Sequence, residues 1–348
     1  MHRTIDFPNL GIHLKSVGDH ITVFGFDIAY YGIVIGIGIL AGLMMAVMEA
    51  KRTHQNVEDY YDLAIYGVIF SIIGARAYYV IFSWDMYKDD IKSIINIREG
   101  GLAIYGGVIT AIVVVFIFAK IKGLSPFLLF DTGGFGLITG QMIGRWGNFF
   151  NREAFGEYTN GLFAMRLPVD AVRSSDITTK MWNHAETVKG VMYIQVHPTY
   201  LYESLWCLLG FVLLAIFAKK IRRYDGQIFL IYICWYGAER AVVESLRTDS
   251  LVIGNVRVSQ ILAITCVVIS IILQIAIGTK VKRMGVDYRM YKDTNESKQM
   301  LAEYEAAKFV KEPEDDTNED TTSTDEVAET DTTDSSESDE TPAETDTN

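Results

Sequence analysis

Residues 140–157 form the segment GQMIGRWGNFFNREAFGE. It closes an apolar run in which glycine recurs at positions 136, 140 and 144, a spacing that lets another helix approach one face closely. The run then turns polar where a buried helix would reach the membrane surface. The polar residues are Arg145, Asn148, Asn151, Arg152, Glu153 and Glu157. Such a cluster at one membrane boundary favours binding of an anionic head group.

The composition predicts a membrane protein despite a sequence pI near 5.0. Half of the 348 residues are apolar, 12% are aromatic and the mean hydropathy is +0.19. The acidity comes from one segment, because residues 312–348 hold 16 Asp or Glu and no Lys or Arg; without them the formal charge changes from −12 to +4. The composition therefore predicts a disordered acidic tail and a mildly basic, strongly apolar body.

Apolar runs of about 20 residues match the length needed to cross about 30 Å of hydrocarbon. We find seven such runs: 28–48, 61–82, 102–119, 127–146, 199–218, 227–246 and 258–278. The predicted fold class is all-α, a polytopic membrane protein with seven transmembrane helices and a small extracytoplasmic head domain. The Gly-rich segment 32–38 lies inside the first run without a strand before it, so we interpret its glycines as packing residues and not as a nucleotide loop.

The uneven distribution of basic residues predicts the orientation. Short basic links follow the first, third, fifth and seventh runs, whereas the alternate links 83–101, 148–198 and 247–257 are longer or less densely basic. The positive-inside rule then places the N-terminus outside and the C-terminus in the cytoplasm. We identify no removable signal peptide before the first run.

These features divide the chain into six predicted regions. They are an extracytoplasmic N-terminal arm (1–27), transmembrane helices 1–4 (28–147), the extracytoplasmic head (148–198), transmembrane helices 5–7 (199–278), a cytoplasmic basic and helical extension (279–311) and the acidic tail (312–348).

A second polar constellation lies in the sixth run, at Tyr236, Arg240, Glu244 and Arg247. Offsets of 4, 4 and 3 predict one polar stripe about 16 Å long on a helix face. One explanation is an internal salt bridge between Arg240 and Glu244. We favour a phosphate ligand, because Arg76 and Arg145 in neighbouring runs bring more positive charge than one or two carboxylates would neutralise. Guanidinium groups bind phosphate bidentately.

Three further segments carry candidate site residues, each with a structural alternative. Arg76 in the second run is expected either to contact substrate or to hold a structural ion pair. Tyr105, between two Gly pairs, either presents its phenol to a ligand or is an ordinary interface aromatic residue. His197 precedes Pro198 and, with Glu203, opens the fifth run, where an orienting hydrogen bond is a commoner role than that of a base.

The three cysteines, Cys207, Cys234 and Cys266, are well separated inside predicted spans. With no CxxC pair and no HExxH motif, the sequence predicts neither a disulfide framework nor a metal site.

Taken together, the motifs resemble the bacterial prolipoprotein diacylglyceryl transferase family over roughly residues 25–280. The segment GRWGNFFNRE (144–153) with Gly156 is similar to the family signature. Four more pieces follow the family pattern in order: Tyr31-Gly32, Gly74-Ala75-Arg76, His197-Pro198-Thr199 with Leu201-Tyr202-Glu203, and Tyr236-Gly237 through Arg240, Glu244 and Arg247. Two positions depart from it: Tyr105 stands where many members have His, and Tyr200 replaces a frequent Gln.

The resemblance implies an enzyme of the bacterial cell membrane that transfers the diacylglyceryl group of phosphatidylglycerol to the lipobox cysteine thiol of a prolipoprotein. It implies no cofactor and no nucleic-acid partner; the partners are the two substrates and the lipid bilayer. The implied catalytic residues are Arg145, Arg240, Asn148, Glu244 and Tyr105. The implied substrate-binding residues are Arg145, Tyr31, Arg76, Glu153, Gly156, His197, Glu203, Tyr236 and Arg247. The group that takes the thiol proton stays open among Tyr105, His197 and Glu244.

Two other protein classes compete with the enzyme. In a transporter or flippase for an anionic lipid or solute, the same arginines would line a path. Transporters of the repeat type show similar halves with interrupted helices, and we find no clear repeat between 28–146 and 199–278. A purely structural membrane scaffold leaves Arg76, Arg145, Arg240 and Arg247 unexplained.

Overall fold

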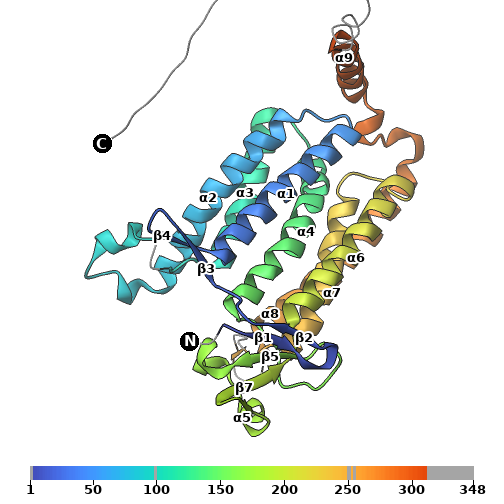
Figure 1. The fold of residues 1–348 in the computed structure, drawn as a ribbon. Coiled ribbons are helices and arrows are strands. Elements are labelled where there is room, and N and C mark those ends of the chain that lie inside the picture. The colour runs from blue at the N-terminus through green and yellow to red at the C-terminus, as the bar shows by residue number, and fades with distance from the viewer. Residues whose placement is uncertain (1–2, 98–99, 249–251, 254–255, 312–348) are drawn as a thin grey trace, which may run out of the picture. The chain divides into compact units, whose positions relative to one another are not determined.

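The computed structural model describes residues 3–97, 100–248, 252–253 and 256–311. The predicted acidic tail (312–348) lies outside the described residues. Residues 1–303 form one compact unit, and a second begins at Tyr304 within α9 (Asn295–Lys311). The described chain is mostly helical, with three small sheets (Figure 1).

Each of the seven predicted apolar runs forms a long helix. The helices are α1 (Tyr30–Arg52), α2 (Glu58–Phe82), α3 (Ile104–Lys122), α4 (Pro126–Asn151), α6 (Thr199–Lys220), α7 (Gln227–Leu246) and α8 (Val258–Met284). Among the described residues, five are long and apolar enough to cross a membrane: α1, α2, α3, α6 and α8. Helices α4 and α7, which carry the two polar constellations, do not meet these criteria.

Glycine lets α1 and α4 pack at backbone contact. A Cβ added at Gly42 would lie 2.7 Å from the carbonyl oxygen of Gly136, and one at Gly38 would lie 3.1 Å from that of Gly140. A residue with a Cβ does not fit between Gly42 and Gly136, and the predicted packing role is confirmed for Gly38, Gly136 and Gly140. An added Cβ at Gly32 or Gly36 would meet no described atom within 4 Å, so these two glycines of the 32–38 segment do not have the predicted packing role. Figure 1 shows the two helices side by side over most of their length.

A pair of tryptophans fixes α6 against α7. The indole N–H of Trp206 donates to the carbonyl oxygen of Trp235 at 3.2 Å, and the indole N–H of Trp235 donates to that of Trp206 at 3.0 Å. The rings stack with centroids 4.7 Å apart. This reciprocal contact sets the register of the two helices that carry Glu203 and Arg240.

The head contains a five-stranded antiparallel sheet, so the all-α prediction is wrong for this part. Its order is β2-β1-β5-β7-β6. The strands are β1 (Ile5–Phe7), β2 (Ile12–Leu14), β5 (Met165–Pro168), β6 (Glu186–Val188) and β7 (Val191–Val196), and the short helix α5 (Thr179–Asn183) precedes β6. Asp6 pairs with Arg166, so residues of the predicted N-terminal arm complete the sheet of the head.

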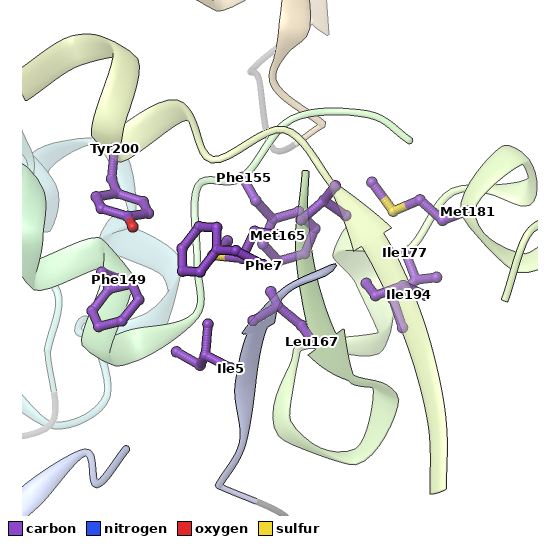
Figure 2. Packing of buried hydrophobic residues seen from close by; sticks show 11 residues of the cluster. Ile5, Phe7, Phe149, Phe155, Met165, Leu167, Ile177, Met181, Ile194 and Tyr200 are labelled. Atoms are coloured by element: carbon purple, nitrogen blue, oxygen red, sulfur yellow. The ribbon is translucent and has the colours of Figure 1, made fainter. Parts of the chain in front are cut away.

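The sheet encloses its own core beside the end of α4. Ile5 and Phe7 from β1 pack with Leu167 and Ile194, and Phe149 near the end of α4 joins the same buried cluster (Figure 2). Because this core includes a residue of α4, the head is packed directly on the C-terminal end of the helix that carries Arg145 and Asn148.

Two further sheets are two-stranded hairpins. One is formed by β3 (His20–Val23) and β4 (Phe26–Ala29) and leads into α1 without a linking residue. The other, formed by β8 (Val252–Ile253) and β9 (Val256–Arg257), leads into α8.

Candidate active site

Three helices bring the two polar constellations together. Arg145 comes from the last turns of α4, Glu203 from the first turns of α6, and Arg240 from the C-terminal half of α7. The antiparallel course of α6 and α7, fixed by the tryptophan pair, places the start of one beside the end of the other. Residues that are 37 or more positions apart in the sequence therefore meet.

Glu203 is the centre of this cluster. Its Oε2 lies 3.2 Å from a guanidinium nitrogen of Arg145, and its Oε1 lies 3.2 Å from one of Arg240. The side chain of Glu203 is only 1% exposed. One buried carboxylate thus holds two arginines that would otherwise repel each other.

Arg240 has a second acidic partner on its own helix. Its Nη2 lies 2.6 Å from the Oε2 of Glu244, one helical turn further along. The internal salt bridge between Arg240 and Glu244, which was one explanation of the polar stripe, is therefore present. It fixes the direction of the Arg240 side chain, while Glu203 holds the same side chain from α6.

A third buried carboxylate, Glu239, was not predicted from the sequence. Glu239 accepts a weak hydrogen bond from the thiol of Cys207 on α6, with sulfur and oxygen 3.7 Å apart. Three buried glutamates therefore surround two arginines, and the predicted excess of arginine is wrong for this cluster. An acidic residue next to Arg240 within an apolar run was the signal that could have identified it.

The predicted helical stripe is also one residue too long. Helix α7 ends at Leu246, and Arg247 has an extended backbone with φ −72° and ψ 146°. Arg247 leaves the face shared by Tyr236, Arg240 and Glu244 and instead forms an isolated β-bridge with Gly156. It lines a separate cavity of about 280 Å³ together with Arg257 and Glu157.

A second polar cluster, centred on the carboxylate of Glu153, lies where α4 ends. Glu153 accepts hydrogen bonds from the side-chain amides of Asn148 at 3.2 Å and Asn151 at 3.3 Å, and it pairs with Arg173 at 3.3 Å. Its neighbours Arg152 and Ala154 both have positive φ, of 52° and 57°. This conformation is costly for residues other than glycine and is concentrated at functional sites.

The two tyrosines of the predicted site lie against these clusters. The ring of Tyr31, at the start of α1, packs on Gly147, where an added Cβ would lie 2.8 Å from the ring. Tyr236 stacks on Tyr232 with centroids 6.1 Å apart, and its phenol is within electrostatic reach of Arg145 and Arg240.

Gly156 and His197 join the head to the helices. The backbone N–H of Gly156 donates to the carbonyl of His197 at 3.0 Å, and an added Cβ would lie 2.8 Å from the Cβ of His197 and 3.0 Å from the carbonyl oxygen of Leu246. Glycine is required where these three segments meet. The His197 imidazole lies 3.2 Å from the hydroxyl of Tyr202, and burial together with Lys180 lowers its pKa below the ordinary value of about 6.5.

We expect this lowered pKa to make stability depend on pH. A folded state that disfavours protonated His197 loses stability as the pH falls through the unfolded pKa, and the loss is complete below the folded pKa. The nearby Lys180 adds to this effect and Glu157 opposes it. Between about pH 7.5 and pH 5, the thermal midpoint of His197→Gln should fall less than that of the parent. Tyr202→Phe keeps the imidazole and should retain the parent slope; an equal slope for His197→Gln would contradict the expectation.

Tyr105 lies at the start of α3. Its phenol is 3.4 Å from the hydroxyl of Ser259 in the first turn of α8. Within the described part of the chain, no hydrogen bond joins it to Arg145 or Arg240. The structure therefore does not bring Tyr105 into the Glu203 cluster by a direct contact.

Arg76 makes its contacts away from the Glu203 cluster, and its geometry favours a structural role over a contact with substrate. Its Nε donates to the carbonyl of Ile94, its Nη1 to those of Gly100 and Gly101, and its Nη2 to those of Ser93 and Asn96, over 2.7–3.1 Å. A guanidinium has five N–H donors, and all five are used. The partners are backbone carbonyls instead of the predicted ion pair. Arg76 thus holds the α2–α3 link, which contains the 3₁₀ turns η2 (Trp84–Met86) and η3 (Ile91–Ile95).

Replacing Arg76 with alanine should loosen this link. Because each lost hydrogen bond has a net worth of about 1 kcal/mol, trypsin should cleave at Lys88 and Lys92 about tenfold faster or more. Arg166→Ala, which breaks only a contact with the exposed Glu186, is the matched control. Unchanged cleavage combined with lost phosphatidylglycerol binding would instead assign Arg76 to the substrate.

These observations define a class: a multi-pass helical membrane protein with paired arginines held by buried carboxylates between its helices. The comparison with known proteins is specific. The family model described as prolipoprotein diacylglyceryl transferase matches residues 20–276, and the chain belongs to this family. The resemblance identified in the sequence is confirmed.

Curated relatives carry the same description. The chain is 42% identical to a phosphatidylglycerol–prolipoprotein diacylglyceryl transferase of Finegoldia magna over 254 residues, which are 73% of this chain and 93% of the relative. It is 42% identical to one of Bacillus mycoides and 43% identical to one of Bacillus anthracis, each over 249 residues, which are 71% of this chain and 87% of the relative.

Proposed function

We propose that the protein transfers the diacylglyceryl group of phosphatidylglycerol to the lipobox cysteine of a prolipoprotein. The new bond joins the cysteine sulfur to a glycerol carbon, the bond between that carbon and the phosphate oxygen breaks, and glycerol-1-phosphate leaves. The thiol proton passes to a base of the protein. Family membership and the names of the relatives support this reaction.

The observation that carries the proposal is the state of the Arg145 guanidinium. Its side chain is 17% exposed, and among the described residues its ion pair is with Glu203, whereas Glu239 acts on it from further away. The donors of Arg76 are all used, whereas no described residue accepts a hydrogen bond from the Arg145 guanidinium, which leaves its donors for solvent or a ligand. A phosphate supplies both the charge and the oxygens.

Charge develops on the phosphate oxygens as the carbon–oxygen bond breaks. Donors fixed in advance and shielded from water stabilise that charge most effectively. We assign this role to Arg145 and Arg240. Glu203 positions both arginines and Glu244 orients Arg240, so the donors need no rearrangement during the reaction.

We place the remaining residues around this centre. Asn148 and Glu153 lie at the end of α4, where the Tyr31 ring from α1 packs on Gly147, and all three fit contacts to the glycerol head group. Tyr236 lies beside the two arginines. Gly156, His197 and Arg247 join the head to the helices and support the site through that junction. Arg76 supports it only through the α2–α3 link.

Three groups can take the thiol proton. They are His197, whose pKa is lowered by burial and by Lys180, Tyr105 at the start of α3, and Glu244, which is the carboxylate nearest to Arg240. The thiol itself has an ordinary pKa near 8.5 and attacks best as thiolate, which the two nearby arginines favour.

The membrane placement that we propose has seven crossings, because α4 and α7 are long enough to span and pack against α1, α3, α6 and α8. The N-terminus and the head then lie outside, and residues 279–311 lie in the cytoplasm with the acidic tail. This orientation puts the arginine cluster at the outer side of the bacterial cell membrane, where secreted prolipoproteins arrive.

The test is a transfer assay with purified protein, phosphatidylglycerol and a lipobox peptide, read by peptide mass and by glycerol phosphate release. A diacylglyceryl mass gain with stoichiometric release is expected. A peptide whose lipobox cysteine is replaced by serine should stay unmodified. No mass gain, with lipid still bound or moved between leaflets, would support the transporter instead.

A further inference from the structure

The hairpin of β3 and β4 has one entirely apolar face. Its register pairs Ile21 with Ile28 and Val23 with Phe26, and side chains alternate between faces along a strand. Ile21, Val23, Phe26 and Ile28 therefore share one face. The opposite face carries His20, Thr22 and Asp27.

That apolar face is not covered by the described chain. All four of its side chains are exposed, with Phe26 at 73%, and Phe24 in the turn is 98% exposed. The hairpin forms a sheet of its own, and Figure 1 shows it apart from the five-stranded sheet of the head. An isolated two-stranded hairpin is marginally stable in water, so an exposed apolar face of this kind requires a partner.

The position of the hairpin identifies this partner. β4 ends at Ala29 and α1 begins at Tyr30, so the hairpin starts at the boundary of a helix that meets the membrane requirement. Its base is fixed there, because the Tyr30 N–H donates to the carbonyl of Asp19 at 2.9 Å and the Tyr30 ring packs on Phe150. The hairpin thus lies at the end of α1 where the exposed apolar side chains of that helix, such as Ile33 and Ile37, begin.

A second segment at the same boundary has the same character. The 3₁₀ turns η2 and η3 follow directly after α2, whose C-terminal end lies at the level of the α1 N-terminus because the two helices are consecutive and antiparallel. Trp84, Met86, Ile91 and Ile95 in this segment are exposed. Aromatic and aliphatic side chains at such a level are typical of interfacial anchors.

We propose that the β3–β4 hairpin lies on the outer leaflet with Ile21, Val23, Phe24, Phe26 and Ile28 inserted among the lipids. The polar face stays in water, where the Thr22 hydroxyl donates to Asp27 at 2.6 Å and His20 lies between Asp19 and Asp27. Residues 20–27, which the sequence assigned to the extracytoplasmic arm, thus form a lipid anchor together with Ile28 from the first apolar run.

The two faces of the hairpin supply a matched pair of probes. Phe26→Trp places an indole on the apolar face of the hairpin, and Thr22→Trp places one on its polar face. Each full-length variant is reconstituted in vesicles of phosphatidylglycerol and phosphatidylcholine, and the fluorescence of the parent, with its five tryptophans, is subtracted. Quenching is measured with lipids brominated on their acyl chains and with iodide in the water.

Brominated lipid should quench the added signal of Phe26→Trp severalfold more than that of Thr22→Trp, and iodide should show the reverse order. Equal quenching of both by iodide would overturn the proposal. The proposal would also be overturned if Phe26→Trp were shielded from iodide only after a lipobox peptide is added, because the peptide would then be the partner. Shielding that grows with the protein-to-lipid ratio would overturn it as well, because a second copy of the chain would then be the partner. The readout needs no turnover, so it stands or falls independently of the proposed reaction.

Discussion

Arg145→Ala is expected to lower the rate of diacylglyceryl transfer by about 10³-fold or more, the scale of losing a main donor to a developing anion. Alanine removes the guanidinium whose donors are left for a ligand, while Glu203 keeps Arg240. Arg145 lies in the last turns of α4, so insertion of the helices should persist. The measurement is the transfer assay, beside thermal midpoints that report folding.

Two variants sharpen this test. Arg145→Lys keeps the charge but lacks the planar fork, so it should recover only part of the rate if phosphate is bound by paired donors. Arg166→Ala removes an arginine that pairs only with the exposed Glu186 and should keep the parent rate. A folded Arg145→Ala protein with normal turnover would sink the assignment of the phosphate site.

Glu203→Ala is expected to cost about 3–5 kcal/mol of stability and to abolish transfer, because two buried guanidinium groups would lose the carboxylate between them. Glu203→Gln keeps the side-chain volume, so it should lose less stability than Glu203→Ala. Its transfer rate should still be low. Glycerol phosphate should raise the thermal midpoint of Glu203→Ala more than that of the parent, since an added anion replaces the missing charge. The midpoint is measured by fluorescence in detergent.

The control for this series is Glu186→Ala, which removes the glutamate of the exposed pair with Arg166. It should change the midpoint little. If Glu203→Ala keeps both the midpoint and the rate of the parent, Glu203 does not hold the arginines in place.

The helices were predictable because each is a long apolar run. The glycines at 136, 140 and 144 were predicted to pack at close range, and two of them contact α1 at its own glycines. The sheet of the head was not predicted. Its strands are three to six residues long, and β1 pairs with a strand more than 150 positions away, so no local periodicity reveals it.

The site could be predicted in its residue types and only partly in its geometry. Arg145 and Arg240 stood out because charge is rare in apolar runs, and the structure joins them. That Glu203 joins them depends on the pairing of α4, α6 and α7, which no pattern within one helix contains. The prediction that Arg247 shares the polar face of α7 was wrong, because α7 ends at Leu246 and helical spacing does not apply beyond that residue.

The stacked pair of Trp206 and Trp235 gives the protein an internal optical reporter. Two indoles 4.7 Å apart couple their excited states, and the coupling depends on their mutual angle, 28° between the ring planes. A shift of α6 along α7 would change that angle and hence the near-ultraviolet circular dichroism. A ligand that shifts these helices against each other would therefore be detected without any label, from a signal generated by the two helices that carry Glu203 and Arg240.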